Sequence, residues 1–135
     1  MPQKAVDLWP EIDVANTRTP VSILKQQAAL LGKHTNNLLE ATVETIASSD
    51  SFVHRFIIEV PALAGYRYEL FSIRHDEKLY PVQIQHGPRT AMPSAYSAWQ
   101  DGIESEEILL EWLKAVLNSP DTKRLLGNLL AQVES

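Results

Sequence analysis

Residues 38–85 contain four short segments in which apolar and polar residues alternate, and this pattern constrains the fold more than any other feature of the chain. In the first segment Leu39, Ala41 and Val43 alternate with polar residues, as in a strand with one buried face. Turn-forming residues follow at positions 48–51 and 61–65. The sequence therefore predicts consecutive antiparallel strands joined by short loops, a β-meander.

The register of this meander is predicted by the pairings that keep apolar residues together. Pairing Val43 with Phe56 leaves residues 48–51 as the first loop, and pairing Phe56 with Leu70 leaves residues 61–65 as the second. Both hairpins then place one set of residues on a shared buried face: Leu39, Ala41, Val43, Phe56, Ile58, Val60, Tyr68 and Leu70. The same register places His54 on that face, opposite Thr45 and Ser72, whose hydroxyls are expected to be the hydrogen-bond partners of a neutral imidazole.

The fourth segment, residues 80–85, contains a proline and is predicted to be an edge strand, because proline donates no backbone hydrogen bond. A loop of odd length before it would place Val82 and Ile84 on the face of Leu70. A tight turn would place them on the opposite face, beside Phe71 and Ile73. We favour the first arrangement.

Helical patterns flank the strands. Thr19 as N-cap, Pro20 at the first position and Gly32 as a left-handed stop predict the first helix. Ser105 and Ser119 are predicted to cap two C-terminal helices. The fold class is therefore α+β: an N-terminal helix, a four-stranded antiparallel β-meander, a long loop and two C-terminal helices packed on the sheet. We expect a single domain over residues 1–135, with an extended N-terminal arm at 1–18 and a long irregular loop at 86–103.

Composition excludes several function classes. The net charge of −5 disfavours binding to nucleic acid or to an anionic membrane. The chain has no cysteine, and its four histidines are scattered, so we expect no metal. No glycine-rich phosphate loop is present, so we expect no cofactor. Without an apolar leader or a membrane-length apolar run, a soluble cytoplasmic protein is expected.

Two apolar surfaces require cover from this chain or from a partner. The predicted outer face of the sheet carries Ile46, Val53, Ile57, Phe71 and Ile73. The last helix carries a long apolar ridge that includes Leu126 and Leu130. We predict these seven residues as interface residues for a protein partner or a second copy. In the arm, Trp9 is expected to dock onto its own domain, and the alternative is that it binds a partner.

Two further sites are weaker candidates. The predicted register aligns Glu40, Glu59 and Arg67 on the outer face, where two carboxylates beside a guanidinium could act as an acid/base pair. A solvated ion network has the same sequence pattern and is commoner. In the loop at 86–103, Met92, Tyr96 and Trp99 could line a ligand pocket against the sheet.

In size and acidity the chain resembles small bacterial secretion chaperones and immunity or antitoxin proteins, a resemblance that no residue motif carries. The function that we expect is a non-catalytic protein-interaction module, such as an adaptor or a chaperone-like or immunity/antitoxin-like protein. Its contacts would be the apolar outer row and the ridge of the last helix, through which it would self-associate as a homodimer or larger homo-oligomer. The alternatives are a small-molecule-binding domain with its pocket at the loop 86–103 and an acid/base enzyme using Glu40 and Glu59.

Overall fold

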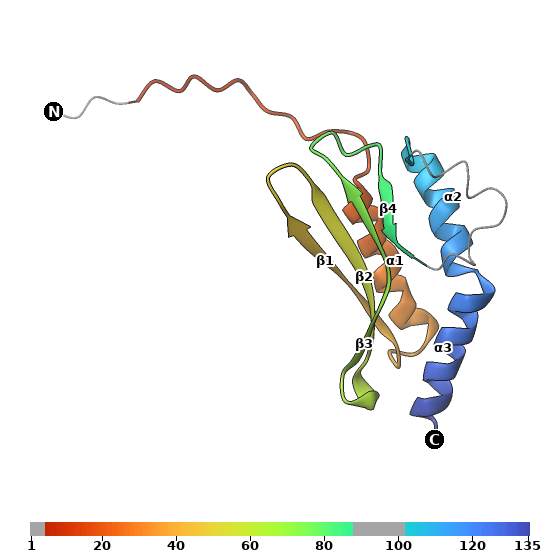
Figure 1. Cartoon of the computed structure of the whole chain (residues 1–135). Helices are drawn as coiled ribbons and strands as arrows, with labels where there is room; N and C mark the ends of the chain where they lie inside the picture. Colours follow the sequence, from red (N-terminus) through yellow and green to blue (C-terminus); the bar gives the residue numbers. More distant parts are fainter. Residues whose placement is uncertain (1–4, 88–101) are drawn as a thin grey trace.

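The computed structural model describes residues 5–87 and 102–135 and confirms the predicted α+β architecture (Figure 1). Along the chain the elements are α1 (Pro20–His34), β1 (Glu40–Ala47), β2 (Phe52–Val60), a 3-10 turn (Pro61–Leu63), β3 (Tyr66–His75), β4 (Gln83–His86), α2 (Glu106–Leu117) and α3 (Pro120–Val133). The strands form one antiparallel sheet in the order β1-β2-β3-β4. All three helices lie against the same face of this sheet (Figure 1).

The three predicted helix starts are confirmed. The side chains of Thr19, Ser105 and Ser119 each accept a hydrogen bond from a backbone N–H of the first helical turn. The predicted stop at Gly32 was wrong, because α1 continues to His34. The Thr35 hydroxyl donates to the Leu31 carbonyl and accepts from the Leu39 N–H, each at 3.1 Å. These bonds satisfy backbone groups at the end of the helix.

The first hairpin has the predicted register, with Val43 opposite Phe56 and Ala47 opposite Phe52. The second hairpin departs from it at Phe56, which lies opposite Phe71 and not Leu70. A β-bulge at this point adds one residue to β3. Leu70 and Phe71 consequently both lie in the core, 4% and 0% exposed.

The bulge also corrects the predicted outer face. Beyond it the alternation of β3 is inverted, so Phe71 and Ile73 belong to the helix-covered core and cannot form an interface. Phe71 stacks on Phe56 with ring centroids 5.0 Å apart and meets the edge of Trp112 at the same distance. These three rings form the centre of the core.

The fourth strand combines features of both predicted alternatives. The tight-turn alternative placed Ile84 beside Ile73, and these two residues are paired. The favoured alternative placed Ile84 on the core face, and both residues do face the helices. Val82 precedes β4 and forms an isolated bridge with Ile103. The predicted irregular loop at 86–103 therefore has paired residues at both ends, since His86 belongs to β4 and Ile103 to the bridge.

Candidate functional site

An apolar groove lies between α1 and α3, with the sheet as its floor. Its volume is about 530 Å³. The floor consists of Phe56 and Ile58 from β2 and Leu70 from β3. The walls and ends are formed by Gln27, Leu30, Leu31, His34, Thr35, Leu117, Asn118, Lys123, Leu126, Gly127 and Leu130. Aliphatic side chains thus line both walls.

The wall on α3 contains two of the residues that the sequence predicted as contacts. Leu126 and Leu130 are half-buried at the groove, between the core and the surface. Gly127 lies between them, and a Cβ atom placed there would have no other atom within 4 Å. A glycine in a helix interior costs about 1 kcal/mol relative to alanine. Here its lack of a side chain keeps the groove wide.

Five of the residues that line the groove have polar side chains: Gln27, His34, Thr35, Asn118 and Lys123. Lys123 from α3 and His34 from α1 are exposed there. Among the described lining residues there is no carboxylate. The margin is therefore neutral to positive, in contrast to a chain whose net charge is −5.

The arm before α1 carries a second set of uncovered apolar side chains. Residues 5–18 contain no helix or strand and extend away from the domain (Figure 1). Its large apolar residues are 74–93% exposed: Val6, Leu8, Trp9, Ile12 and Val14. The expectation that Trp9 docks onto its own domain was wrong. The alternation of apolar residues at positions 6, 8, 12 and 14 could have been detected in the sequence but was missed.

The base of the arm is fixed to the domain at Arg18. The Arg18 guanidinium pairs with the Glu106 carboxylate at the start of α2, with 3.2 Å between Nε and Oε2. The Tyr80 hydroxyl donates to the Arg18 carbonyl at 2.9 Å. These contacts hold the chain beside the first turns of α1 and α2, at the opposite end of α1 from the groove (Figure 1).

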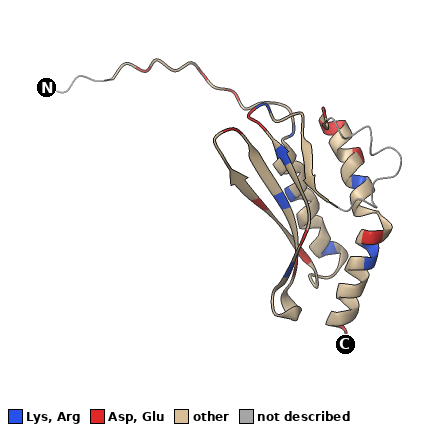
Figure 2. Ribbon diagram, viewed as in Figure 1, with Lys and Arg blue, Asp and Glu red and all other residues tan. Residues whose placement is uncertain are grey.

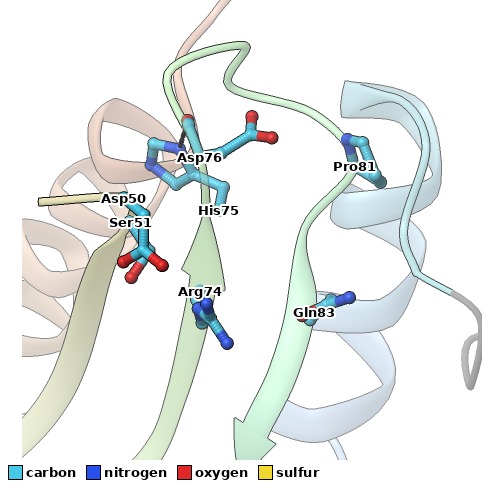
Figure 3. A pocket seen from close by; sticks show the side chains of 7 residues that line it. All are labelled: Asp50, Ser51, Arg74, His75, Asp76, Pro81 and Gln83. Atoms are coloured by element: carbon cyan, nitrogen blue, oxygen red, sulfur yellow. Dashed lines mark hydrogen bonds between the residues drawn. The ribbon is translucent and has the colours of Figure 1, made fainter.

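A smaller polar pocket of about 230 Å³ lies where β2, β3 and the segment before β4 meet (Figure 3). Its lining combines two carboxylates with a guanidinium and an imidazole: Asp50, Ser51, Arg74, His75, Asp76, Pro81 and Gln83. Behind it, the Nε2 atoms of His54 and His75 are 2.8 Å apart. The predicted partner Thr45 is confirmed at 2.9 Å from His54 Nδ1, whereas Ser72 is not a partner because the bulge places Ile73 opposite His54.

Hydrogen-bond partners assign the tautomers of this pair. His75 Nδ1 lies 2.6 Å from the Asp76 carbonyl oxygen, which can only accept, so this nitrogen carries the proton. When His75 is neutral, its Nε2 accepts from His54 Nε2–H, and His54 Nδ1 accepts from the Thr45 hydroxyl. Burial, the neighbouring His75 and then Lys25 lower the pKa of His54 to about 4. The pair is a satisfied structural network near neutral pH.

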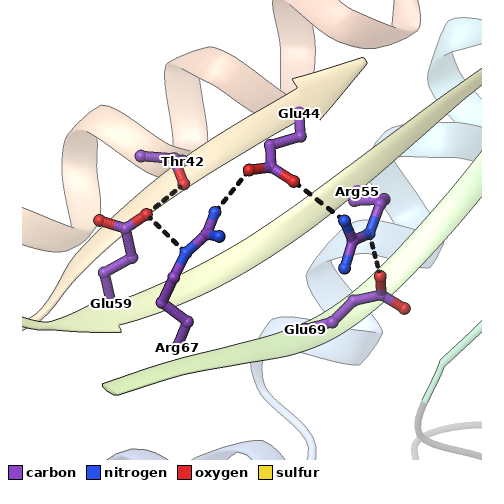
Figure 4. Close-up of polar contacts among 6 residues, drawn as sticks. All are labelled: Thr42, Glu44, Arg55, Glu59, Arg67 and Glu69. Atoms are coloured by element: carbon purple, nitrogen blue, oxygen red, sulfur yellow. Dashed lines mark hydrogen bonds and ion pairs between the residues drawn. The ribbon is translucent and has the colours of Figure 1, made fainter. Parts of the chain in front are cut away.

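The open face of the sheet carries a chain of alternating charges (Figure 4). Arg67 contacts Glu59 at 3.2 Å and Glu44 at 2.6 Å, and Arg55 contacts Glu44 at 2.9 Å and also pairs with Glu69. This arrangement matches the solvated ion network that the sequence analysis considered commoner. Bonding to Arg67 is the largest of the effects that lower the pKa of Glu44, the opposite direction from what a general acid requires.

The candidate catalytic residues are only partly brought together. Glu40 lies opposite Glu59, and Glu59 lies opposite Arg67, as predicted. Glu59 accepts from Arg67 and from the Thr42 hydroxyl, whereas Glu40 is exposed at the edge strand. Neither carboxylate lines the apolar groove or the polar pocket.

Of the predicted apolar outer face, three residues remain there. Ile46 is 54% exposed and lies opposite Val53, which is half-buried. Ile57 is 2% exposed although it lies opposite Thr42 and Glu69, outside the core cluster that the helices cover. Its neighbours on this face of β2 are Arg55 and Glu59, which belong to the charged network. The prediction that Ile57 forms an interface was therefore wrong, because it is already buried.

The candidate ligand residues Met92, Tyr96 and Trp99 lie outside the described residues. In residues 5–87 and 102–135 no three histidine, aspartate or glutamate side chains are grouped to hold a metal ion. No helix within these ranges is long and apolar enough to cross a membrane. Comparison with family models, with curated proteins and with solved structures finds no match to this chain.

Proposed function

We propose that this protein is a non-catalytic protein-interaction module that binds an apolar segment of a polypeptide in the groove between α1 and α3. The observation that supports this proposal most strongly is the groove itself, about 530 Å³ in volume and bounded by aliphatic walls. Folded proteins rarely leave concave apolar surface of this kind uncovered unless it binds something.

The shape and chemistry of the groove favour a polypeptide ligand. Helical walls with leucines at Leu30, Leu126 and Leu130 are typical of grooves that receive apolar side chains from a peptide. Two of its polar lining residues, His34 and Lys123, are exposed, and they would contact the backbone or the acidic side chains of such a ligand. A metabolite site would instead need polar groups that converge on one point inside the cavity.

Gly127 permits a direct test of this proposal. Gly127→Trp fills the groove from the α3 wall, where the structure has free space for a side chain. Asn128→Trp adds the same side chain at an exposed neighbouring position that does not line the groove. Both variants should fold, because neither replaces a core residue.

The measurement is selection from a library of short random peptides, followed by amide chemical-shift mapping with a selected peptide. We expect selected peptides to be rich in aliphatic residues and to shift the amides of Leu30, Leu126 and Leu130. Gly127→Trp should abolish binding, and Asn128→Trp should retain it. Equal binding by both variants, or shifts confined to the open face of the sheet, would refute the proposal.

A further inference from the structure

We infer that the groove binds the N-terminal arm of a second copy of this chain, so that two copies exchange residues 6–14. This inference depends on the proposed function and names the occupant of the groove. It joins two apolar surfaces that the described residues of one copy leave open: the groove and an arm whose large apolar side chains are 74–93% exposed. The groove has apolar walls that could receive side chains, and the arm has apolar side chains that could enter it.

The pattern of the arm fits an extended ligand with one apolar edge. The even positions Val6, Leu8, Ile12 and Val14 are aliphatic, with a proline at position 10. In an extended chain these side chains point to one side and the odd positions to the other. The odd positions from 7 to 13 hold Asp7, Trp9, Glu11 and Asp13, and residues 5–17 contain no basic residue. The arm therefore has an aliphatic edge and a mainly acidic edge that also carries Trp9.

Charge at the groove is complementary to this arm. Lys123 and His34 are at the margin, and no carboxylate is among the lining residues that the structure describes. Figure 2 shows acidic positions along the arm, in red, and basic positions on α1 and α3, in blue. With the aliphatic edge buried between the helices, the acidic edge would face this basic margin.

The dimensions also agree. From Gln27 to Thr35 the α1 wall spans about 12 Å at 1.5 Å per residue. An extended chain covers that length with about four residues. The groove would thus hold two or three consecutive even-numbered side chains, and the remainder of the arm would connect the two copies.

The arm of the same copy does not reach this groove directly. Arg18 is held beside Glu106 and Tyr80, and from there the arm leads away from the domain (Figure 1). The groove begins at Gln27 and extends toward the far end of α1. A second copy can present its arm without reversal of the chain at Arg18, and reciprocal exchange forms a closed twofold dimer.

The free edge of β1 is the competing position for an extended arm, and charge disfavours it. An arm added there would place its acidic edge beside Glu40 or Glu44 if its apolar edge continued the core face. Like charges on neighbouring strands are destabilising. At the groove the same acids meet a lysine and a histidine.

Disulfide trapping can identify the occupant, because the chain has no cysteine of its own. Two single-cysteine proteins with tags of different size, Ile12→Cys and Leu126→Cys, are mixed under mild oxidation. We expect a mixed disulfide to form about tenfold faster than in the control mixture of Ile12→Cys with Ile46→Cys, because a bound arm has an effective concentration of about millimolar. Repeating the experiment with Leu8→Cys determines which part of the arm is in the groove.

Sedimentation velocity on the full chain measures the association itself. We expect a concentration-dependent dimer whose dissociation constant rises at least about tenfold in Leu8→Asp/Ile12→Asp and in Gly127→Trp. The aspartates remove aliphatic contact from the arm, and the tryptophan fills the groove that would receive the arm. Asn128→Trp should leave the dissociation constant unchanged. Lys123→Glu should weaken the dimer by up to about fivefold, and Asp13→Lys should reverse that loss.

The possible failures can be told apart. A monomer at high micromolar concentration that still binds selected peptides in the groove would overturn arm exchange and leave the proposed function intact. A monomer that binds no peptide would overturn both. Preferential cross-linking of Ile12→Cys to Ile46→Cys would replace the groove with the β1 edge as the docking position.

Discussion

The two faces of the sheet hold polar side chains in opposite ways. On the helix-covered face, His54 and His75 are 3% and 6% exposed and bind one another. On the open face, Arg67 and Glu44 pair while 48% and 40% of their side-chain surfaces stay exposed. Removing one histidine leaves a buried polar group without a hydrogen-bond partner. Removing one member of the exposed ion pair lets water solvate the other. Burial therefore determines how much each network contributes to the free energy of unfolding.

The same contrast applies to apolar residues, and the bulge in β3 decides which face each one occupies. Phe71 is fully buried between Phe56 and Trp112, whereas Ile46 on the open face is 54% exposed. Phe71→Ala should reduce the free energy of unfolding by about 3–5 kcal/mol. Ile46→Ala should change it by less than about 0.5 kcal/mol. Urea denaturation of both variants measures the difference, and an equally large loss for Ile46→Ala would show that a partner covers the open face.

The histidine pair should show the next largest effect. His75→Leu removes the acceptor of His54 Nε2–H and leaves a buried donor unsatisfied, at a cost of about 1–3 kcal/mol. Adding His54→Leu should recover part of this loss, because the unsatisfied donor is removed with its ring. The measurement is a double-mutant cycle by chemical denaturation. Additive losses in the two single variants would mean that the pair is not coupled.

The pH dependence of stability separates the two faces further. The pKa of His54 is about 4 in the folded chain against an ordinary value of 6.5, so between these values the unfolded chain binds more protons. The contribution of His54 is complete above pH 6.5 and is lost as the pH falls toward 4. One proton changes the free energy of unfolding by at most about 1.4 kcal/mol per pH unit. Denaturation curves between pH 7 and pH 4 should show this slope in the wild type, and His54→Leu should lack it.

Glu44 on the open face should respond in a lower pH range. Its pKa lies below the ordinary 4.5, so its contribution is present above that value and is lost at more acidic pH. Glu44→Gln should therefore leave the pH dependence of the free energy of unfolding unchanged above pH 4.5. A change in that upper range would mean that the two faces are electrostatically coupled.

Much of the fold could be predicted because local patterns specify it. Strict alternation and the turn residues at 48–51 were sufficient for the β1–β2 register, and Thr19, Ser105 and Ser119 were sufficient for the helix starts. The bulge was not predicted, although the adjacent apolar residues Leu70 and Phe71 interrupt the alternation there. An extra residue in one strand alters every pairing beyond it.

The candidate site could be predicted only in part, because it depends on how separate elements pack. Leu126 and Leu130 were recognised from their helical spacing as part of an apolar ridge, and both line the groove. Their counterpart Leu30 lies on α1, and no local pattern specifies the separation between α1 and α3. The contact between His54 and His75 was missed for the same reason, since it requires the inverted register after the bulge.

The smallest expected effect concerns the charged network itself. Arg67→Gln removes two ion pairs on the open face, yet exposed pairs contribute only about 0.2–1 kcal/mol each. Arg74→Gln, an exposed arginine on the same face, is the matched control. The difference between the two variants should be measurable by urea denaturation at low salt and should vanish near 1 M salt, where the screening length is about 3 Å. A loss of several kcal/mol that persists in high salt would mean that the Arg67 side chain stabilises the sheet through packing, because salt screens only its charge.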